Sequence, residues 1–224
     1  LALNGLHTSP GQRNEIGNAI MSMWKNGDKT ITDFCTSIQD ISIREALKQY
    51  TIEGSMGHLL DADQDGLALS RFTTFEIEEL MGLGEKYGLP VLLYLFRRIE
   101  RALHGQPAVI ILDEAWIMLG NPVFREKIRE WLKVLRKANC AVIMATQSLT
   151  DAAGSGILDV ILEATATKIF LPNIYARDED TAALYARMGL NRRQIDIIAG
   201  AIPKRHYYVV SEKGRRLVEL ALGP

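Results

Sequence analysis

Two adjacent carboxylates, Asp113 and Glu114, follow the apolar run Val109–Leu112. An apolar run of this kind is typical of a strand buried on both faces of a parallel sheet. Ligands of such sheets bind beyond the carboxyl ends of the strands, so we expect the two acids at a binding edge. One carboxylate can hold Mg²⁺ while its neighbour polarises an attacking water, which is the chemistry of nucleotide hydrolysis. The alternative is a helix N-terminus that carries acidic residues.

A second apolar run, Cys140–Ala145, leads into Thr146, Gln147 and Ser148. We expect this run to form a strand that ends at the same edge of the sheet. A glutamine at that position can hydrogen-bond both a γ-phosphate and a water, and so report which nucleotide is bound. The alternative is that Ser148 or Thr150 only caps the following helix.

The elements around these two strands predict an α/β domain, because strand and helix patterns alternate from residue 71 onward. We expect strands at 71–78, 108–112, 140–145 and 168–171, helices at 89–103, 121–137, 157–163, 178–188 and 192–198, and a closing hairpin of 205–210 and 215–220. Residues 10–66 are expected to be mostly helical, with Ser9 capping a helix over 10–27 and Thr32 or Asp33 capping the next. The predicted organisation is a helical subdomain, 1–66, and an ATPase core, 67–224.

The composition narrows the class of protein. The 224 residues are 47% hydrophobic and carry a net charge of −1, so no global field draws the chain to nucleic acid or to an anionic membrane. Two distant cysteines do not indicate a disulfide framework, and no run reaches the roughly 18 apolar residues of a membrane helix. The acidic turn Asp61-Ala-Asp63-Gln-Asp65 has Phe72 where a calcium loop needs glutamate, so we expect a tight turn there.

Five segments together resemble the TrbE/CagE class of conjugative-transfer and type IV secretion ATPases, which relate to the VirB-type energising ATPase. They are LLDADQDGLAL, RFTTFEIEELM, VIILDEAWIML, WLKVLRKANCAVIMATQS and IFLPN. The resemblance covers nearly the whole chain and is closest over 59–220. It implies a RecA-like P-loop NTPase core, with a mostly parallel sheet flanked by helices, that uses ATP and Mg²⁺.

The resemblance also implies roles for individual residues. Asp113 is similar to the Walker B carboxylate that binds the metal and its nucleotide, Glu114 to the catalytic base, and Gln147 to the sensor of the γ-phosphate. Arg136 and Lys137 resemble a basic pair that faces a neighbouring subunit's nucleotide, where an arginine would spread transition-state charge.

Two basic residues also have simpler explanations. Arg136 is equally explained as a cation favoured at a helix C-terminus. Arg205 is a weaker second candidate for nucleotide binding, and a solvated strand end accounts for it as well.

The chain departs from the family pattern in one respect, because it contains no Walker A loop of the form G-x-x-x-x-G-K-[ST]. The sequence Asn26-Gly-Asp-Lys29-Thr30 lacks the first glycine and the Gly-Lys pair of that loop. We therefore expect a C-terminal fragment of a longer ATPase. In RecA-like sheets the Walker A strand is central, so its loss would remove the phosphate cradle and leave inner strand edges unpaired.

The function expected from the resemblance is ATP hydrolysis that energises pilus assembly or the transfer of DNA or protein. We expect the chain alone to be inactive for lack of Walker A. The expected partners are further copies in a homo-oligomeric ring, a hexamer, and other secretion-channel proteins, with DNA as a further candidate. The expected location is the cytoplasm, at the inner face of the bacterial inner membrane and associated through partners. The alternatives are a DNA-translocating ATPase of the HerA/FtsK kind and a non-catalytic truncated scaffold.

Overall fold

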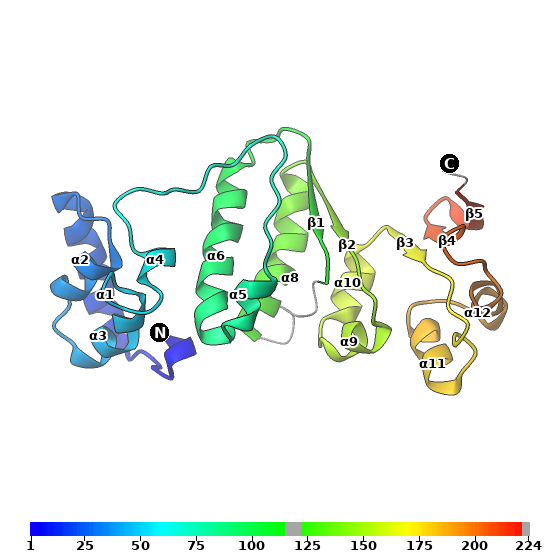
Figure 1. Cartoon of the computed structure of the whole chain (residues 1–224), viewed down its shortest axis with the longest axis horizontal. Coiled ribbons are helices and arrows are strands. Elements are labelled where there is room, and N and C mark those ends of the chain that lie inside the picture. The colour runs from blue at the N-terminus through cyan, green and yellow to red at the C-terminus, as the bar shows by residue number, and fades with distance from the viewer. Residues whose placement is uncertain (115–121, 221–224) are drawn as a thin grey trace. The chain divides into compact units, whose positions relative to one another are not determined.

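The computed structural model describes residues 1–114 and 122–220 of the chain (Figure 1). The chain divides into two compact units, Leu1–Ala102 and Leu103–Pro224. The predicted division after residue 66 concerns the extent of the ATPase domain, which packing alone does not test, and it stays a prediction. No described helix has both the length and the apolar composition needed to cross a membrane.

The first unit is helical throughout its described length. Its helices are η1 (Ala2–Asn4), α1 (Pro10–Asn26), α2 (Ile31–Ser37), α3 (Ile41–Leu47), η2 (Lys48–Tyr50), α4 (Gly57–Leu60), α5 (Glu78–Gly82) and α6 (Glu85–Ala102). Ala19, Ile38 and Ile43 form the centre of a small core between the first three α-helices. The predicted helices over 10–27 and 89–103 are confirmed by α1 and α6.

Side chains at the helix starts explain where the first helices begin. Ser9 accepts a hydrogen bond from the backbone of Gln12, whose side chain accepts one from the Ser9 N–H, so the two form a capping box before Pro10. The cap of α2 is Thr30, and the prediction of Thr32 or Asp33 was wrong by two or three positions. Thr30 satisfies the Asp33 N–H, whose own side chain completes the box.

The acidic turn is tied to this same helix start. Asp61 is buried, and its carboxylate accepts hydrogen bonds from the backbone N–H groups of Ile31 and Thr32 and from the Thr32 hydroxyl. Asp65 is paired with Arg98 of α6. These carboxylates therefore cap a helix and bind a guanidinium within the first unit.

The predicted strand over 71–78 is wrong. Residues 71–77 form neither helix nor strand, and Glu78 begins α5. The Phe72 side chain is 86% exposed, and the Thr73 hydroxyl accepts a hydrogen bond from the Ser70 N–H in a local turn. A β-rich composition forms a strand only where a partner strand can pair with it, and no described strand lies in the first unit.

The second unit alternates strands and helices. It contains β1 (Ala108–Leu112), α8 (Pro122–Lys137), β2 (Cys140–Met144), α9 (Leu149–Gly154), α10 (Leu158–Ala164), β3 (Thr167–Phe170), α11 (Glu179–Arg187), α12 (Arg192–Ala199), β4 (His206–Ser211) and β5 (Gly214–Glu219). These bounds confirm the strands and helices predicted from residue 108 onward, although Asn121 and Trp116 lie outside the described residues. The α/β fold class is confirmed.

The described strands form two separate sheets. β1 and β2 are parallel and in register, from Ala108 opposite Cys140 to Leu112 opposite Met144. β3, β4 and β5 form an antiparallel sheet in that order. Helix α8 connects β1 to β2 and packs on β2, and it buries Ile128, Trp131 and Leu135 along one face.

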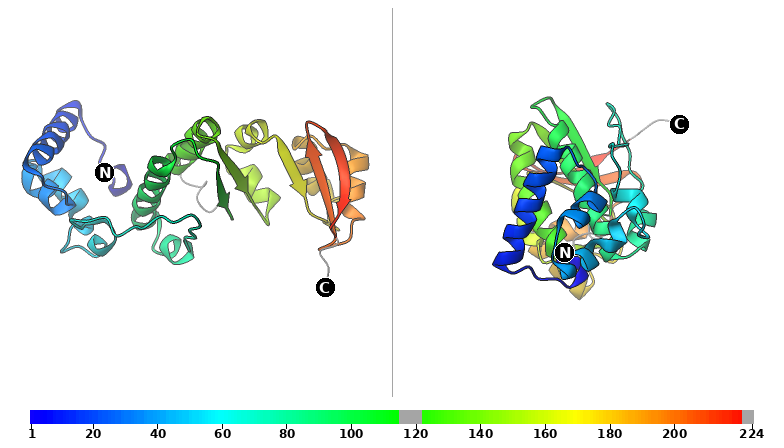
Figure 2. Two further views of the ribbon diagram at one scale, coloured as in Figure 1. Left: turned by 90° about the horizontal axis from the view of Figure 1, so that it is seen from above. Right: turned by 90° about the vertical axis from the view of Figure 1, so that its left-hand side faces the viewer.

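The C-terminal sheet has its own core. Phe170 of β3 and Tyr208 of β4 are buried with Tyr185 of α11 and Ile198 of α12. The rings of Phe170 and Tyr185 meet edge to face, with centroids 5.8 Å apart. Figure 2 shows the β4–β5 hairpin, in orange to red, lying against the helices of this end of the chain. This core holds β3 in place from one side only, through β4.

Candidate nucleotide site

The parallel pairing of β1 and β2 brings their carboxyl ends to one edge of the sheet. Asp113 and Glu114 follow β1 directly, and Gln147 is the third residue after β2. The Ala145 N–H donates to the carbonyl of Leu112 at 3.0 Å, so the pairing continues one residue beyond β2. The expectation that the acid pair and the glutamine share one edge is met by this register.

Both acids are open to solvent to some degree, since Asp113 is exposed and Glu114 is half-buried. Asp113 Oδ1 accepts a hydrogen bond of 3.1 Å from the Glu114 backbone N–H. Its other oxygen and lone pairs are therefore directed beyond the strand, where a cation could be bound.

Glu114 has a left-handed backbone, with φ of 51°. Residues other than glycine are uncommon in this region, and strain of this kind concentrates at functional sites. The left-handed residue ends β1 abruptly and turns the chain away from the sheet, so Glu114 departs from the strand line that Asp113 continues. Nothing in the residue types around Glu114 signals this backbone conformation.

Gln147 lies in a short loop held by its two neighbours. The Thr146 hydroxyl accepts a 2.7 Å hydrogen bond from the Ser148 N–H and donates to the Ser148 carbonyl at 2.9 Å. Ser148 also caps α9 by accepting from the Asp151 N–H. The capping interpretation is thus confirmed for Ser148, and it leaves the exposed Gln147 side chain outside these bonds. Thr146 is a positioning residue that the sequence reasoning did not single out.

Arg136 and Lys137 lie at the other edge of the same sheet. They are the last residues of α8, are exposed, and precede β2 by two residues. A five-residue strand separates them from the end of β2, a span of about 16 Å. A site within one chain therefore does not bring these two residues to Asp113, and a role at a nucleotide requires a neighbouring subunit.

Arg205 is engaged in the C-terminal sheet. Its guanidinium forms an ion pair with the carboxylate of Glu219 in β5, and its carbonyl accepts the Leu220 N–H at 2.9 Å. Both partners of the ion pair are exposed, so it contributes little to stability. A contact of Arg205 with nucleotide would require this pair to open.

The donor set at the sheet edge suits Mg²⁺ bound mainly through a nucleotide. Among the described residues, no group of three or more His, Cys, Asp or Glu side chains could hold a metal ion. Mg²⁺ in phosphate-transfer sites commonly takes one or two carboxylates, and phosphates and waters supply the remaining ligands. Asp113 fits that pattern, while the chain has no glycine-rich loop of its own to hold the phosphates.

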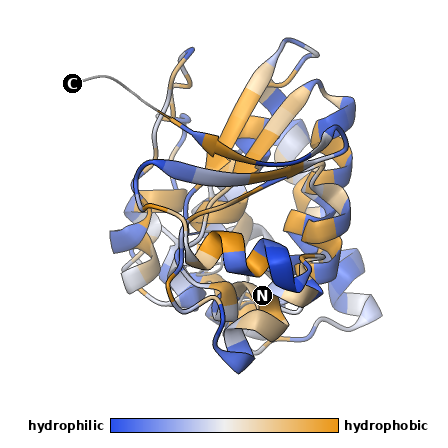
Figure 3. Cartoon of the chain, turned by 90° about the vertical axis from the view of Figure 1, so that its right-hand side faces the viewer, coloured by the Kyte–Doolittle hydropathy of each residue, from blue (hydrophilic) through white to orange (hydrophobic). Residues whose placement is uncertain are grey.

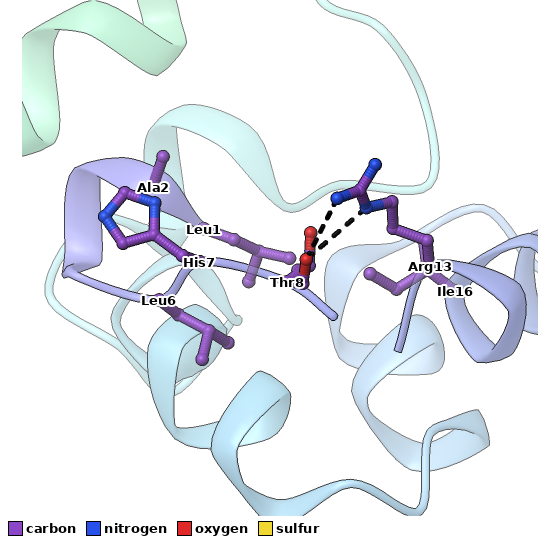
Figure 4. A pocket seen from close by; sticks show the side chains of 7 residues that line it. All are labelled: Leu1, Ala2, Leu6, His7, Thr8, Arg13 and Ile16. Carbon is purple, nitrogen blue, oxygen red and sulfur yellow. Dashed lines mark hydrogen bonds between the residues drawn. The ribbon is translucent and has the colours of Figure 1, made fainter. Parts of the chain in front are cut away.

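A pocket in the first unit is of a different kind (Figure 4). Its volume is about 290 Å³, and it is lined by Leu1, Ala2, Leu6, His7, Thr8, Arg13 and Ile16. The Arg13 guanidinium donates to the Thr8 carbonyl at 3.3 and 3.4 Å. The lining holds no carboxylate, so it offers neither an acidic metal ligand nor a carboxylate base.

Comparison with known proteins places the chain among transfer ATPases. Residues 17–201 match the model of the TraG P-loop domain. The chain is 58% identical over all 224 residues to the conjugal transfer protein TrbE of Rhizobium radiobacter, and 56% identical to a probable conjugal transfer protein TrbE of Sinorhizobium fredii. It spans 27% and 34% of the lengths of these two relatives.

More distant relatives belong to secretion systems. The type IV secretion system protein virB4 of Bartonella quintana is 29% identical over 218 residues, which are 97% of this chain and 26% of that protein. The solved structure of VirB4 of Thermoanaerobacter pseudethanolicus superimposes with a TM-score of 0.70 at 17% identity, covering 100% of this chain and 67% of that one. At this identity the structural match shows the fold, which is that of a P-loop ATPase.

Proposed function

Because the chain belongs to the TraG P-loop domain family and is of the TrbE/VirB4 type, we propose that it is the Walker B portion of an ATPase that energises conjugal transfer or type IV secretion. The observation that carries the proposal is the shared edge of β1 and β2, where Asp113, Glu114 and Gln147 follow adjacent parallel strands. The partners in this proposal are further copies in a hexameric ring and other transfer proteins at the inner face of the inner membrane. DNA is a candidate substrate.

Each residue of the edge has one role in this proposal. Asp113 binds Mg²⁺ of a Mg·ATP complex, either directly or through a water. Glu114 accepts a proton from the attacking water, for which it must lie within hydrogen-bond reach of that water. Gln147 donates its amide N–H to the γ-phosphate and its carbonyl oxygen accepts from the same water. The phosphate cradle is supplied by a polypeptide segment that carries a Walker A loop.

The basic pair acts between subunits in this proposal. The position of Arg136 and Lys137 at the far edge of the sheet favours contact with a neighbour's nucleotide over contact within the chain. Arg136 would then stabilise the negative charge that develops on the transferred phosphoryl group. Arg205, which is paired with Glu219, is a second candidate for the nucleotide.

Phosphate release provides the test. The 224-residue chain alone is expected to show background turnover with Mg·ATP, and co-expression with the remaining portion of the Rhizobium radiobacter protein is expected to restore it. Glu114→Gln should abolish the restored turnover, while Glu212→Gln, in the exposed turn between β4 and β5, should not change it. Robust turnover by the chain alone that is lost in Glu114→Gln would contradict the proposed inactivity. Restored turnover that survives Glu114→Gln would contradict the proposed base.

A mixing experiment tests the role between subunits. Assemblies made only of Arg136→Ala chains, or only of Glu114→Gln chains, should both be inactive. Assemblies that mix the two should regain some of the turnover, because some interfaces then join an intact Arg136 to an intact Glu114. Mixtures that stay inactive would place Arg136 outside the neighbour's site.

A further inference from the structure

The two sheets of the second unit have edges that no described strand covers. β2 pairs with β1 on one side only, and β3 pairs with β4 on one side only. The chain between them runs through two helices, α9 and α10. A connection through helices is the type that returns the chain to begin another strand of the same sheet.

Hydrogen bonds fix which backbone groups lie at the open edge of β2. Ala108 N–H donates to the Asn139 carbonyl at 3.2 Å, and Ala145 N–H donates to the Leu112 carbonyl at 3.0 Å. Residues of a parallel strand alternate between their two neighbours, so the odd-numbered residues of β2 bond to β1. The N–H and C=O groups of Cys140, Val142 and Met144 therefore point away from β1.

The same reasoning gives the open edge of β3. The Leu220 N–H donates to the Arg205 carbonyl, which makes 205 and 220 a hydrogen-bonded pair across β4 and β5. The alternating residues of β4 then bond to β3 and pair Tyr208 with Phe170. Thr167 and Ile169 consequently direct their N–H and C=O groups away from β4.

Neither open edge has the protection that exposed edges usually carry. β2 contains no charged residue, and β3 has only Lys168. Natural edge strands avoid further pairing with charges, prolines or bulges, and unprotected apolar edges promote aggregation. Figure 3 shows the hydrophobic character of the strands.

One face of the parallel pair is also open. Val109, Ile111 and Ile143 are 61%, 66% and 52% exposed, whereas the opposite face lies towards α8. Ile169 of β3 is 59% exposed. Parallel sheets are almost always covered on both faces, so a two-stranded parallel sheet with a bare apolar face lacks some of its surroundings.

We propose that β2 and β3 flank one vacant strand position, and that a strand from the portion of the protein that this chain does not span adds to both edges and joins the two sheets into one. The relatives supply the argument for the occupant, because this chain spans only 27% and 34% of their lengths. The added strand has roughly five residues, is mostly apolar and β-branched, and contains no proline, because it is buried between two strands. The proposal concerns assembly of the sheet and does not depend on ATP turnover.

Hydrogen exchange on a reconstituted complex tests the proposal. The 224-residue chain is co-expressed with the remaining portion of the Rhizobium radiobacter protein, and the complex is compared with the chain alone. We expect co-purification, and at least tenfold slower exchange at Val142, Met144 and Ile169. The outer edge of β5, at Leu217, should exchange equally in both samples.

Two proline variants separate edge pairing from other contacts. Proline is tolerated at an edge where its position would direct an N–H to solvent, but it prevents pairing with an added strand. Val142→Pro is therefore expected to keep the circular dichroism of the chain alone and to weaken co-purification at least tenfold. Leu217→Pro, at the outer edge of β5, is expected to leave co-purification unchanged.

Three outcomes would overturn the proposal. In the first, the two polypeptides do not associate. In the second, they associate without added protection at β2 and β3. In the third, the chain alone protects these strands as its concentration rises, which would make a second copy the occupant. Association and protection in a complex without turnover would keep the added strand and count only against the proposed ATPase activity.

Discussion

The carbonyl of Leu112 accepts a hydrogen bond from the N–H of Ala145 at 3.0 Å. This single bond sets the distance along the sheet edge between the acid pair and the glutamine. Asp113 follows the acceptor directly, and Gln147 lies two residues beyond the donor. A slip of β2 by one residue would exchange its two faces and move Gln147 along the edge, so the register of this pair is a condition for the proposed chemistry.

The first prediction concerns Gln147. In the reconstituted assembly, Gln147→Ala should lower ATP turnover by about 100-fold, because loss of one hydrogen-bond donor to a developing negative charge has an effect of that size. Nucleotide affinity should change much less, since the γ-phosphate keeps its other ligands. Phosphate release and binding of a fluorescent nucleotide measure the two quantities. Gln194→Ala, on α12, is the control, and an equal loss of turnover in both variants would contradict a sensor role.

The second prediction concerns the backbone strain at Glu114. Glycine adopts a φ of 51° without a steric penalty, whereas alanine retains the penalty of a Cβ atom. Glu114→Gly should therefore be more stable than Glu114→Ala by about 0.5–1 kcal/mol, after allowance for the greater entropy of unfolded glycine. Urea unfolding of both variants gives the difference. A glycine variant that is less stable than the alanine variant would show that the left-handed conformation is absent in solution.

The third prediction compares two tryptophans. Trp131 of α8 is 1% exposed, and Trp24 of α1 is 84% exposed. Trp131→Ala should lower the free energy of unfolding by about 3–5 kcal/mol, because it leaves a large cavity between α8 and its surroundings. Trp24→Ala should change it by less than about 0.5 kcal/mol. Circular dichroism during denaturation measures both, and comparable losses in the two variants would contradict the packing described for α8.

The sequence was sufficient for the strands and helices of the second unit, because buried strands and amphipathic helices carry clear periodicities. The run Val109–Leu112 and the face of Ile128, Trp131 and Leu135 are examples. The composition of 71–78 predicted a strand incorrectly, because pairing depends on a neighbour that local sequence does not encode.

The site was only partly predictable, for a similar reason. The order of strands and acids indicated the shared edge of Asp113 and Gln147, but the left-handed turn at Glu114 depends on how the chain leaves the sheet. The separation of β2 from β3 is likewise a property of tertiary pairing. Predictions from pattern were thus correct where a residue's own periodicity decides its structure, and incomplete where a distant segment does.

The last prediction concerns stability at alkaline pH. Burial raises the pKa of the Tyr185 phenol, and the Asn173 amide, which donates to the phenol oxygen at 3.3 Å, offsets some of this rise. A folded pKa above the unfolded value of about 10 means that the neutral phenol contributes stability below that pH, and that the contribution is lost as the pH rises towards the folded pKa. Tyr185→Phe has no phenol to ionise.

The variant should therefore lose less stability than the original chain between about pH 9 and pH 11, even though the lost hydrogen bond lowers its stability at neutral pH by about 1 kcal/mol. Urea unfolding at a series of pH values measures both effects. Tyr175→Phe is the control, because Tyr175 is 64% exposed and its ionisation requires no burial of charge. Parallel pH profiles for the original chain and Tyr185→Phe would mean that the ring between β3 and α11 is accessible to water, which would contradict the buried core of the C-terminal sheet.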